Sequence, residues 1–162
     1  MVCSKFNSSF SIVNHRLMGD GVVHLACVNN TRKLEGPDMI VLHYTAGTSA
    51  ESSSIFLTRP DVSASAHLVI GRKGEVFQLV PFHIEAWHAG KSWYAGRGGL
   101  NRYSIGIELD NLGQLQLEGG KFVAECGKEV PVKEVYSEDS GEMPTYWHDY
   151  TDEQMRVLNE VC

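Results

Sequence analysis

The stretch MIVLHYTAGT, residues 39–48, sets the fold class. Its first six residues are apolar or β-branched at almost every position, which is typical of a strand buried on both faces in the centre of a sheet. Small residues then end the strand. Ser49 is a good helix N-cap, and we expect a helix from there to Thr58, because Arg59-Pro60-Asp61 is a stop signal.

Further strands alternate with turns along the chain. Residues 66–70 and 75–80 flank a Gly-Arg-Lys-Gly turn and predict a hairpin. The segment SIGIELD, residues 104–110, predicts another buried strand, and Thr151 predicts the cap of a second helix. The pattern indicates an α/β fold with a central mixed β-sheet flanked by helices.

The length indicates one domain, because 162 residues suit a single hydrophobic core. We therefore expect residues 1–162 to form a single domain with two additions. Residues 1–38 predict an N-terminal extension, with a strand or hairpin packed on the domain. Residues 113–148 are rich in glycine and acids and predict an insertion with one short hairpin, formed by 122–124 and 130–135.

Charge and hydropathy exclude several classes of protein. The net charge of −6 argues against a nucleic-acid binder, and most of the acidity lies in residues 113–162. No apolar run is long enough to span a membrane. The N-terminus lacks the apolar core of a signal peptide, so we expect no export signal. The four cysteines lie far apart and form no CxxC motif, which excludes a zinc knuckle.

Two ionisable residues interrupt the apolar strands. His43 lies at the end of its strand, where an imidazole suits a metal ligand or a general base. Glu108 lies near the end of the later strand, where burial would raise the carboxyl pKa toward neutrality and suit a general base. The alternatives are a hydrogen-bonded core histidine at 43 and a solvent-facing glutamate at 108.

A loop rich in glycine and aromatic residues is the third candidate. AWHAG, residues 86–90, precedes Trp93, Tyr94 and Asn101. Aromatic rings in such a loop can form a flat platform for a sugar ring, and His88 can donate to a polar substrate. The alternative is a loop pinned to the core by its tryptophans. His67 lies within a strand and is typical of a structural histidine behind a site.

Five segments in this order carry a resemblance. HYTAG (43–47), SAHLVI (65–70), AWHAG (86–90), NRYSIGIE (101–108) and YTDEQ (150–154) together resemble the zinc-dependent N-acetylmuramoyl-L-alanine amidases of the AmpD type. These enzymes share a fold with peptidoglycan-recognition proteins. The resemblance implies hydrolysis of the amide between N-acetylmuramic acid and L-alanine, with peptidoglycan or a muropeptide as substrate.

The resemblance also implies roles for single residues. His43 falls on the first zinc ligand and Glu108 on the catalytic glutamate. Zinc would lower the pKa of bound water to about 7, and Glu108 would take its proton. We expect substrate contacts from the residues around these two, namely Tyr44, Thr45, His67, Trp87, His88 and Asn101.

The sequence departs from the family pattern at its end. In relatives, a second histidine, a third ligand and a basic residue follow the helix that begins near Thr151, so we expect the remaining zinc ligands beyond Cys162. Three interpretations stay open: an amidase lacking its C-terminal segment, a peptidoglycan-binding module without catalysis, and a site completed by a second chain or by other groups (His67, His88, His148 or Asp149). A missing strand would leave an exposed sheet edge and favour a homodimer.

Other expectations concern class and location. A Cys–His peptidase needs a thiol at a helix N-terminus, and none of the four cysteines begins a predicted helix. The absence of a recognisable signal peptide favours a cytoplasmic enzyme or an endolysin of the phage type.

Overall fold

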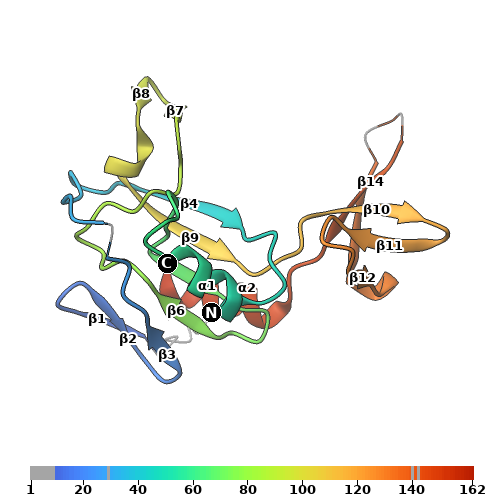
Figure 1. The fold of residues 1–162 in the computed structure, drawn as a ribbon, viewed down its shortest axis with the longest axis horizontal. Helices are drawn as coiled ribbons and strands as arrows, with labels where there is room; N and C mark the ends of the chain where they lie inside the picture. Colours follow the sequence, from blue (N-terminus) through green and yellow to red (C-terminus); the bar gives the residue numbers. More distant parts are fainter. Residues whose placement is uncertain (1–9, 29, 140, 142) are drawn as a thin grey trace, which may run out of the picture.

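The main sheet is mixed and has five strands. The computed structural model describes residues 10–28, 30–139, 141 and 143–162. The strand order is β3-β6-β5-β9-β4 (Figure 1). Strands β4, β9 and β5 run parallel, β6 is antiparallel to β5, and β3 is parallel to β6. The bounds are β3 (Val22–His24), β4 (Met39–Tyr44), β5 (Leu68–Ile70), β6 (Val76–Gln78) and β9 (Ser104–Leu109).

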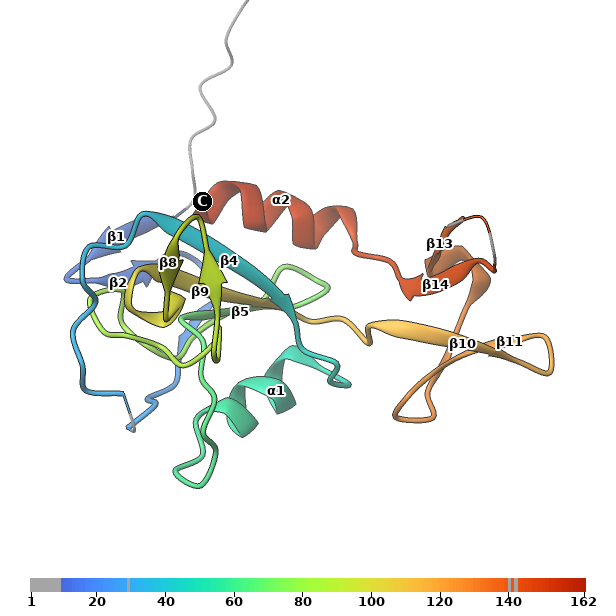
Figure 2. The ribbon, with the colours of Figure 1, turned by 90° about the horizontal axis from the view of Figure 1, so that it is seen from above.

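Two helices cover opposite faces of this sheet. Helix α1 (Ala50–Leu57) and helix α2 (Asp152–Val161) lie on either side of it (Figure 2). Ile107 packs in one core cluster with residues of α2, and Val69 packs in another with residues of α1. The expected α/β architecture, a mixed sheet flanked by helices, is therefore confirmed.

Local sequence signals fix where each helix begins. The Ser49 hydroxyl accepts a hydrogen bond from the backbone N–H of Ser52 at 3.2 Å. The Thr151 hydroxyl accepts one from the N–H of Gln154 at 3.1 Å. Each cap satisfies a backbone donor that the first helical turn leaves unpaired. Both predicted caps are confirmed.

Strand β4 lies at the edge of the sheet, so its predicted central position was wrong. Ile40 and Leu42 are 45% and 50% exposed. β9 pairs with one side of β4, and β4 ends the strand order. The face of β4 that carries Ile40 and Leu42 is therefore partly open, and an apolar pattern does not report whether both edges of a strand are paired.

The described residues of the 113–148 segment form a second sheet, which is more than the single hairpin expected. Its antiparallel order is β12-β11-β10-β14-β13. The predicted hairpin is present in part, as β11 and β12, in which Phe122 pairs with Val130, but residues 132–134 of its predicted second strand form a 3₁₀ turn. Leu115, Ala124 and Val130 form a small core of their own.

The bounds are β10 (Gln114–Glu118), β11 (Lys121–Ala124), β12 (Glu129–Val130), β13 (Val135–Glu138) and β14 (Thr145–His148). We call residues 113–148 the insertion; it projects from the main sheet (Figure 1).

Shorter elements complete the chain. Strands β1 (Ser11–Val13) and β2 (Arg16–Met18) form the expected N-terminal hairpin. Residues 1–9 and 29, which belong to the predicted extension, lie outside the described residues. The 81–102 segment is loop apart from β7 (Trp93–Tyr94), β8 (Arg97–Gly98) and a short 3₁₀ turn at Leu100–Arg102. No helix in the described part of the chain has the length and apolar character needed to cross a bilayer.

Candidate active site

His43 and Glu108 lie side by side on the sheet. They are register partners on the parallel strands β4 and β9. Side chains alternate between the two faces of a strand, and partners in register share a face. Neighbouring strands are about 4.8 Å apart, so the imidazole and the carboxyl group leave the sheet next to each other. Both side chains are partly buried.

Glu108 lies at one wall of a cleft of about 370 Å³. Burial disfavours its charged form and raises the pKa of the carboxyl to about 7. Such a group accepts a proton from water near neutral pH and can return it. Tyr44 and Thr45, which follow His43, line the same cleft. The structure thus brings three of the predicted site residues together.

The opposite wall of the cleft comes from α1 and the turn before it. Residues of this segment line the cavity, namely Gly47, Thr48, Ser52, Ser53, Phe56 and Leu57. The sequence interpretation did not include them. A helix was predicted here, but α1 lacks a clear apolar stripe, so nothing in the pattern indicated which of its side chains would meet Glu108.

A chain of hydrogen bonds orients His43. Its Nε2 lies 3.1 Å from Nδ1 of His88, and Nε2 of His88 lies 3.1 Å from the Ser104 hydroxyl. That hydroxyl donates to the Leu100 carbonyl at 2.7 Å, so it accepts from His88. His88 Nδ1 is then an acceptor, and His43 donates through Nε2–H. Nδ1 of His43 is left as the nitrogen with a free lone pair.

His88 lies directly over a glycine of β9. A Cβ atom on Gly106 would come within 2.2 Å of Cγ of the His88 ring. Gly106 and Glu108 share a face of the strand, since they are two positions apart. The ring therefore occupies space beside Glu108 that only a glycine leaves open. Burial and the neighbouring His43 lower the pKa of His88 to about 4, so His88 is neutral at pH 7.

Asn101 and Thr45 hold the loops of the site. The Asn101 side-chain oxygen accepts from the backbone N–H groups of His88 at 3.1 Å and Ala89 at 2.7 Å. The Thr45 hydroxyl accepts from the N–H of Gly47 at 3.2 Å and of Asn111 at 3.3 Å. Asn101 fixes the loop that carries His88, and Thr45 fixes the turn beside the cleft.

His67 and Trp87 do not line the cleft. His67 is fully buried, donates through Nε2 to the Ile84 carbonyl at 2.9 Å, and accepts at Nδ1 from the Gly106 N–H at 3.0 Å. Both ring nitrogens are thus used within the fold, which leaves none for a substrate and differs from the contact expected for His67. Trp87 is partly buried, and its backbone N–H donates to Ser65.

The described residues do not complete a metal site. A catalytic zinc takes three protein ligands. Within 10–28, 30–139, 141 and 143–162, no group of three or more His, Cys, Asp or Glu side chains is arranged to hold a metal ion. His43 could supply one ligand through Nδ1. His148, named above as an alternative, lies instead at the base of the insertion, where its Nδ1 accepts from the Leu112 N–H.

Comparisons with known proteins agree with this geometry. Residues 32–162 match the sequence profile of the N-acetylmuramoyl-L-alanine amidases. The 1,6-anhydro-N-acetylmuramyl-L-alanine amidase AmpD of Escherichia coli is 42% identical over 79 residues, which cover 49% of this chain and 43% of AmpD. The N-acetylmuramoyl-L-alanine amidase AmiD of the same organism is 38% identical over 93 residues, 53% of this chain and 33% of AmiD.

A solved structure shares the fold. The complex of Escherichia coli AmiD with anhydro-N-acetylmuramic acid-L-Ala-D-γ-Glu-L-Lys is similar with a TM-score of 0.53 and 25% identity, over 94% of this chain and 49% of that one. The matches span less than half the length of these relatives. The profile covers most of the chain, and so the chain belongs to the N-acetylmuramoyl-L-alanine amidase family.

Proposed function

We propose that this protein hydrolyses the amide bond between the lactyl group of N-acetylmuramic acid and L-alanine in peptidoglycan or a muropeptide. The observation that carries the proposal is the pairing of His43 with Glu108 beside a cleft of about 370 Å³. Family membership supports it, because both relatives compared above are named as amidases of this bond. The same names favour an enzyme over a module that only binds.

Glu108 is proposed as the proton carrier of the reaction. Its carboxylate takes a proton from a water molecule while the water oxygen attacks the amide carbonyl carbon. The C–N bond of the resulting tetrahedral species then breaks, and Glu108 returns the proton to the departing amine of L-alanine. A pKa of about 7 lets one group take up and release the proton at neutral pH.

The other predicted residues are proposed to support this step. Tyr44 and Thr45 line the cleft and are placed to contact substrate. His88 positions His43 through the 3.1 Å hydrogen bond, and Asn101 positions His88 through its backbone. Asn101 therefore acts by holding the loop, which differs from the direct substrate contact expected from the sequence.

The test is release of the stem peptide from N-acetylmuramoyl-L-Ala-D-γ-Glu-L-Lys. Glu108→Gln keeps the size of the side chain and removes the base, so we expect turnover to fall by about 100-fold or more. Glu51→Gln, an exposed glutamate of α1 outside the cleft, is the matched control and should keep full activity. Both proteins are assayed with zinc added, and equal, measurable activity in Glu108→Gln and the unmodified chain would exclude this assignment.

Zinc is proposed as the cofactor on family grounds, with His43 as a ligand. One imidazole is too few for tight binding, and the described residues supply no group of three. We therefore expect these 162 residues to retain little zinc after dialysis. Elemental analysis of the chain and of His43→Ala measures this, and one zinc per chain after dialysis would contradict the expectation.

Two further expectations stay predictions. The exposed apolar residues of the edge strand β4 favour the homodimer expected from the sequence, and light scattering coupled to gel filtration measures its mass. Action in the cytoplasm on soluble fragments, or on polymeric wall as an endolysin, is tested by comparing turnover of a muropeptide with turnover of purified sacculi.

A further inference from the structure

A second hollow adjoins the cleft, at the base of the insertion. Its volume is about 250 Å³. Four aromatic side chains line it: Tyr44 from β4, Tyr136 from β13, Trp147 from β14, and Tyr150 from the segment before α2. This volume is below the range of about 300–1,000 Å³ typical of pockets for whole drug-sized ligands. The hollow therefore suits one ring of a larger ligand.

Two aromatic residues of the insertion, Tyr136 and Trp147, are not used in its core. Tyr136 and Trp147 are cross-strand partners on β13 and β14, so they share one face of the small sheet. Leu115 and Tyr146 are partners on the opposite face and pack in its hydrophobic core. Tyr136 is 55% exposed. Two large rings thus project away from the core they could have filled, toward the main sheet.

Tyr44 joins the hollow to the cleft. Tyr44 is among the residues that line both cavities, and its ring stands edge-on to Trp147, with ring centroids 6.4 Å apart. Gly113 leaves room for it, because a Cβ there would come within 2.5 Å of the Tyr44 ring. Burial, followed by Tyr44 and Glu108, raises the pKa of the Tyr150 hydroxyl.

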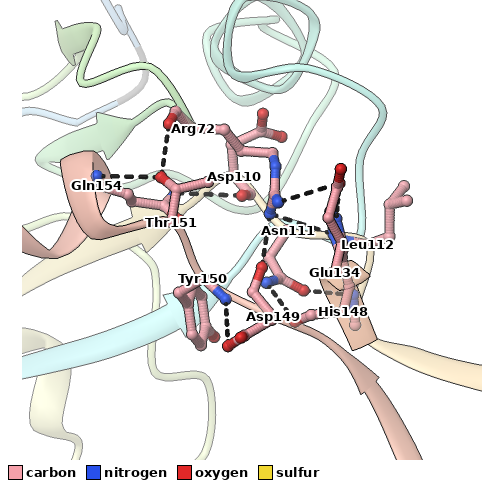
Figure 3. Close-up of polar contacts among 11 residues, drawn as sticks. Arg72, Asp110, Asn111, Leu112, Glu134, His148, Asp149, Tyr150, Thr151 and Gln154 are labelled. Carbon is pink, nitrogen blue, oxygen red and sulfur yellow. Dashed lines mark hydrogen bonds and ion pairs between the residues drawn. The ribbon is translucent and has the colours of Figure 1, made fainter. Parts of the chain in front are cut away.

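A hydrogen-bond network fixes the hollow in place. Figure 3 shows Arg72 and Asn111 of the main body meeting His148 and Asp149 of the chain that returns from the insertion. Arg72 donates to the Asp149 carbonyl at 2.7 Å, and Asn111 donates to the His148 carbonyl at 2.8 Å. The Leu112 N–H donates to Nδ1 of His148 at 3.1 Å. The walls of the hollow are therefore held before any ligand arrives.

The charges of the residues that line the hollow indicate which kind of ligand ring it would bind. The described residues that line the hollow include the carboxylates Glu138 and Asp149 and no lysine or arginine. Carboxylates accept hydrogen bonds from hydroxyl groups, and aromatic faces pack on apolar C–H surfaces. A stem peptide carries carboxylates of its own, which these side chains would repel. A neutral pyranose offers hydroxyls at its rim and C–H groups on its faces.

We propose that the hollow between Tyr44, Tyr136 and Trp147 is a saccharide subsite, which binds a neutral N-acetylhexosamine ring of the glycan strand next to the residue held at the cleft. The proposal rests on the proposed function, since it takes the muramic acid to lie beside Glu108. It assigns a glycan strand of at least two sugars as the preferred substrate class.

The test is binding of tetra-N-acetylchitotetraose, a neutral oligomer of N-acetylglucosamine without peptide, to the full chain. Three tryptophans give three indole N–H signals in a nitrogen–proton correlation spectrum, which single Trp→Phe variants assign. We expect the Trp147 signal to move saturably with probe. Tyr136→Ala should weaken binding about 5- to 10-fold, and Tyr136→Phe, which keeps the ring, should retain it.

Several outcomes would overturn the subsite. One is no shift at millimolar probe, and another is a shift that the free peptide L-Ala-D-γ-Glu-L-Lys produces and the sugar does not. Tyr94→Ala on β7, 66% exposed, removes a comparable ring elsewhere. Loss of binding in Tyr94→Ala but not in Tyr136→Ala would move the sugar to that hairpin and refute the proposal. Binding needs no turnover, so a failure of the amidase assay alone leaves this result unchanged.

Discussion

His43 and Glu108 are directly opposite each other on two parallel strands and project from one face of the sheet. Their backbones are one strand spacing apart, about 4.8 Å, so the imidazole and the carboxyl group start from neighbouring points on that face. Had the register differed by one residue, the imidazole and the carboxyl would lie on opposite faces. The pairing is the structural reason for regarding this cleft as a hydrolytic site.

The first prediction is the pH dependence of hydrolysis. Glu108 acts as a base only when deprotonated, and burial raises its pKa to about 7. Activity should therefore be low at pH 5, half-maximal near pH 7, and level above about pH 8. The measurement is kcat/KM for the soluble muropeptide across this range. A profile that is flat down to pH 5 would show that the reaction depends on a carboxyl group with an unshifted pKa, or on no carboxyl group.

Local signals predicted much of the fold. The caps at Ser49 and Thr151 were found because a hydroxyl followed by helix-forming residues satisfies backbone donors within one turn. The strand at 104–110 was found from its apolar run. The edge position of β4 was not found, because edge pairing depends on the order of strands far apart in sequence.

The site was only partly predictable for the same reason. Residue type and position within a strand pointed to His43 and Glu108. The contact between His88 and His43 joins residues 45 positions apart, and no periodic pattern encodes it. For His67, the sequence pattern predicted a histidine near the site but not the groups that its ring nitrogens bind. The carbonyl of Ile84 and the N–H of Gly106, which occupy its ring, belong to other segments.

The second prediction concerns the close approach of Gly106 to His88. In Gly106→Ala the new methyl group would meet the imidazole ring, which must turn away. The ring then loses its hydrogen bonds to His43 and Ser104. We expect about 1–3 kcal/mol of lost stability, as for other overpacked positions, together with loss of hydrolysis. Urea unfolding and the muropeptide assay measure the two effects.

A double-mutant cycle serves as the control. If the clash with the ring is the cause, Gly106→Ala should cost much less stability when His88 is already alanine. Equal costs in both backgrounds would mean that the strand backbone, and not His88, is disturbed.

The third prediction is a loss of stability in mild acid. Burial lowers the pKa of His67 to about 4 in the folded chain, against 6.5 for an exposed histidine. Between these values the unfolded chain binds the extra proton, so the free energy of unfolding falls as the pH drops from about 6.5 toward 4. The loss should be on the order of 2 kcal/mol from this group by about pH 4.5. Urea titrations at pH 7 and 4.5 measure it.

The control is His67→Gln, in which the free energy of unfolding should differ less between the two pH values. An unchanged difference would assign the effect to other groups.

The fourth prediction tests how the insertion is fastened to the main sheet. Asn111 is 2% exposed and donates to the His148 carbonyl (Figure 3). It also accepts from the Gly113 N–H at 2.8 Å. Asn111→Ala leaves both backbone groups without these partners, which should cost about 1–3 kcal/mol. The bonds lie where the chain enters and leaves the insertion, so the cost should fall on local opening of that sheet. Amide hydrogen exchange should therefore speed up in β10, β13 and β14 and stay slow in β5 and β9.

Gln116→Ala, an exposed polar position on β10, is the matched control and should leave exchange unchanged. Uniform acceleration across both sheets in Asn111→Ala would mean that they unfold as one unit.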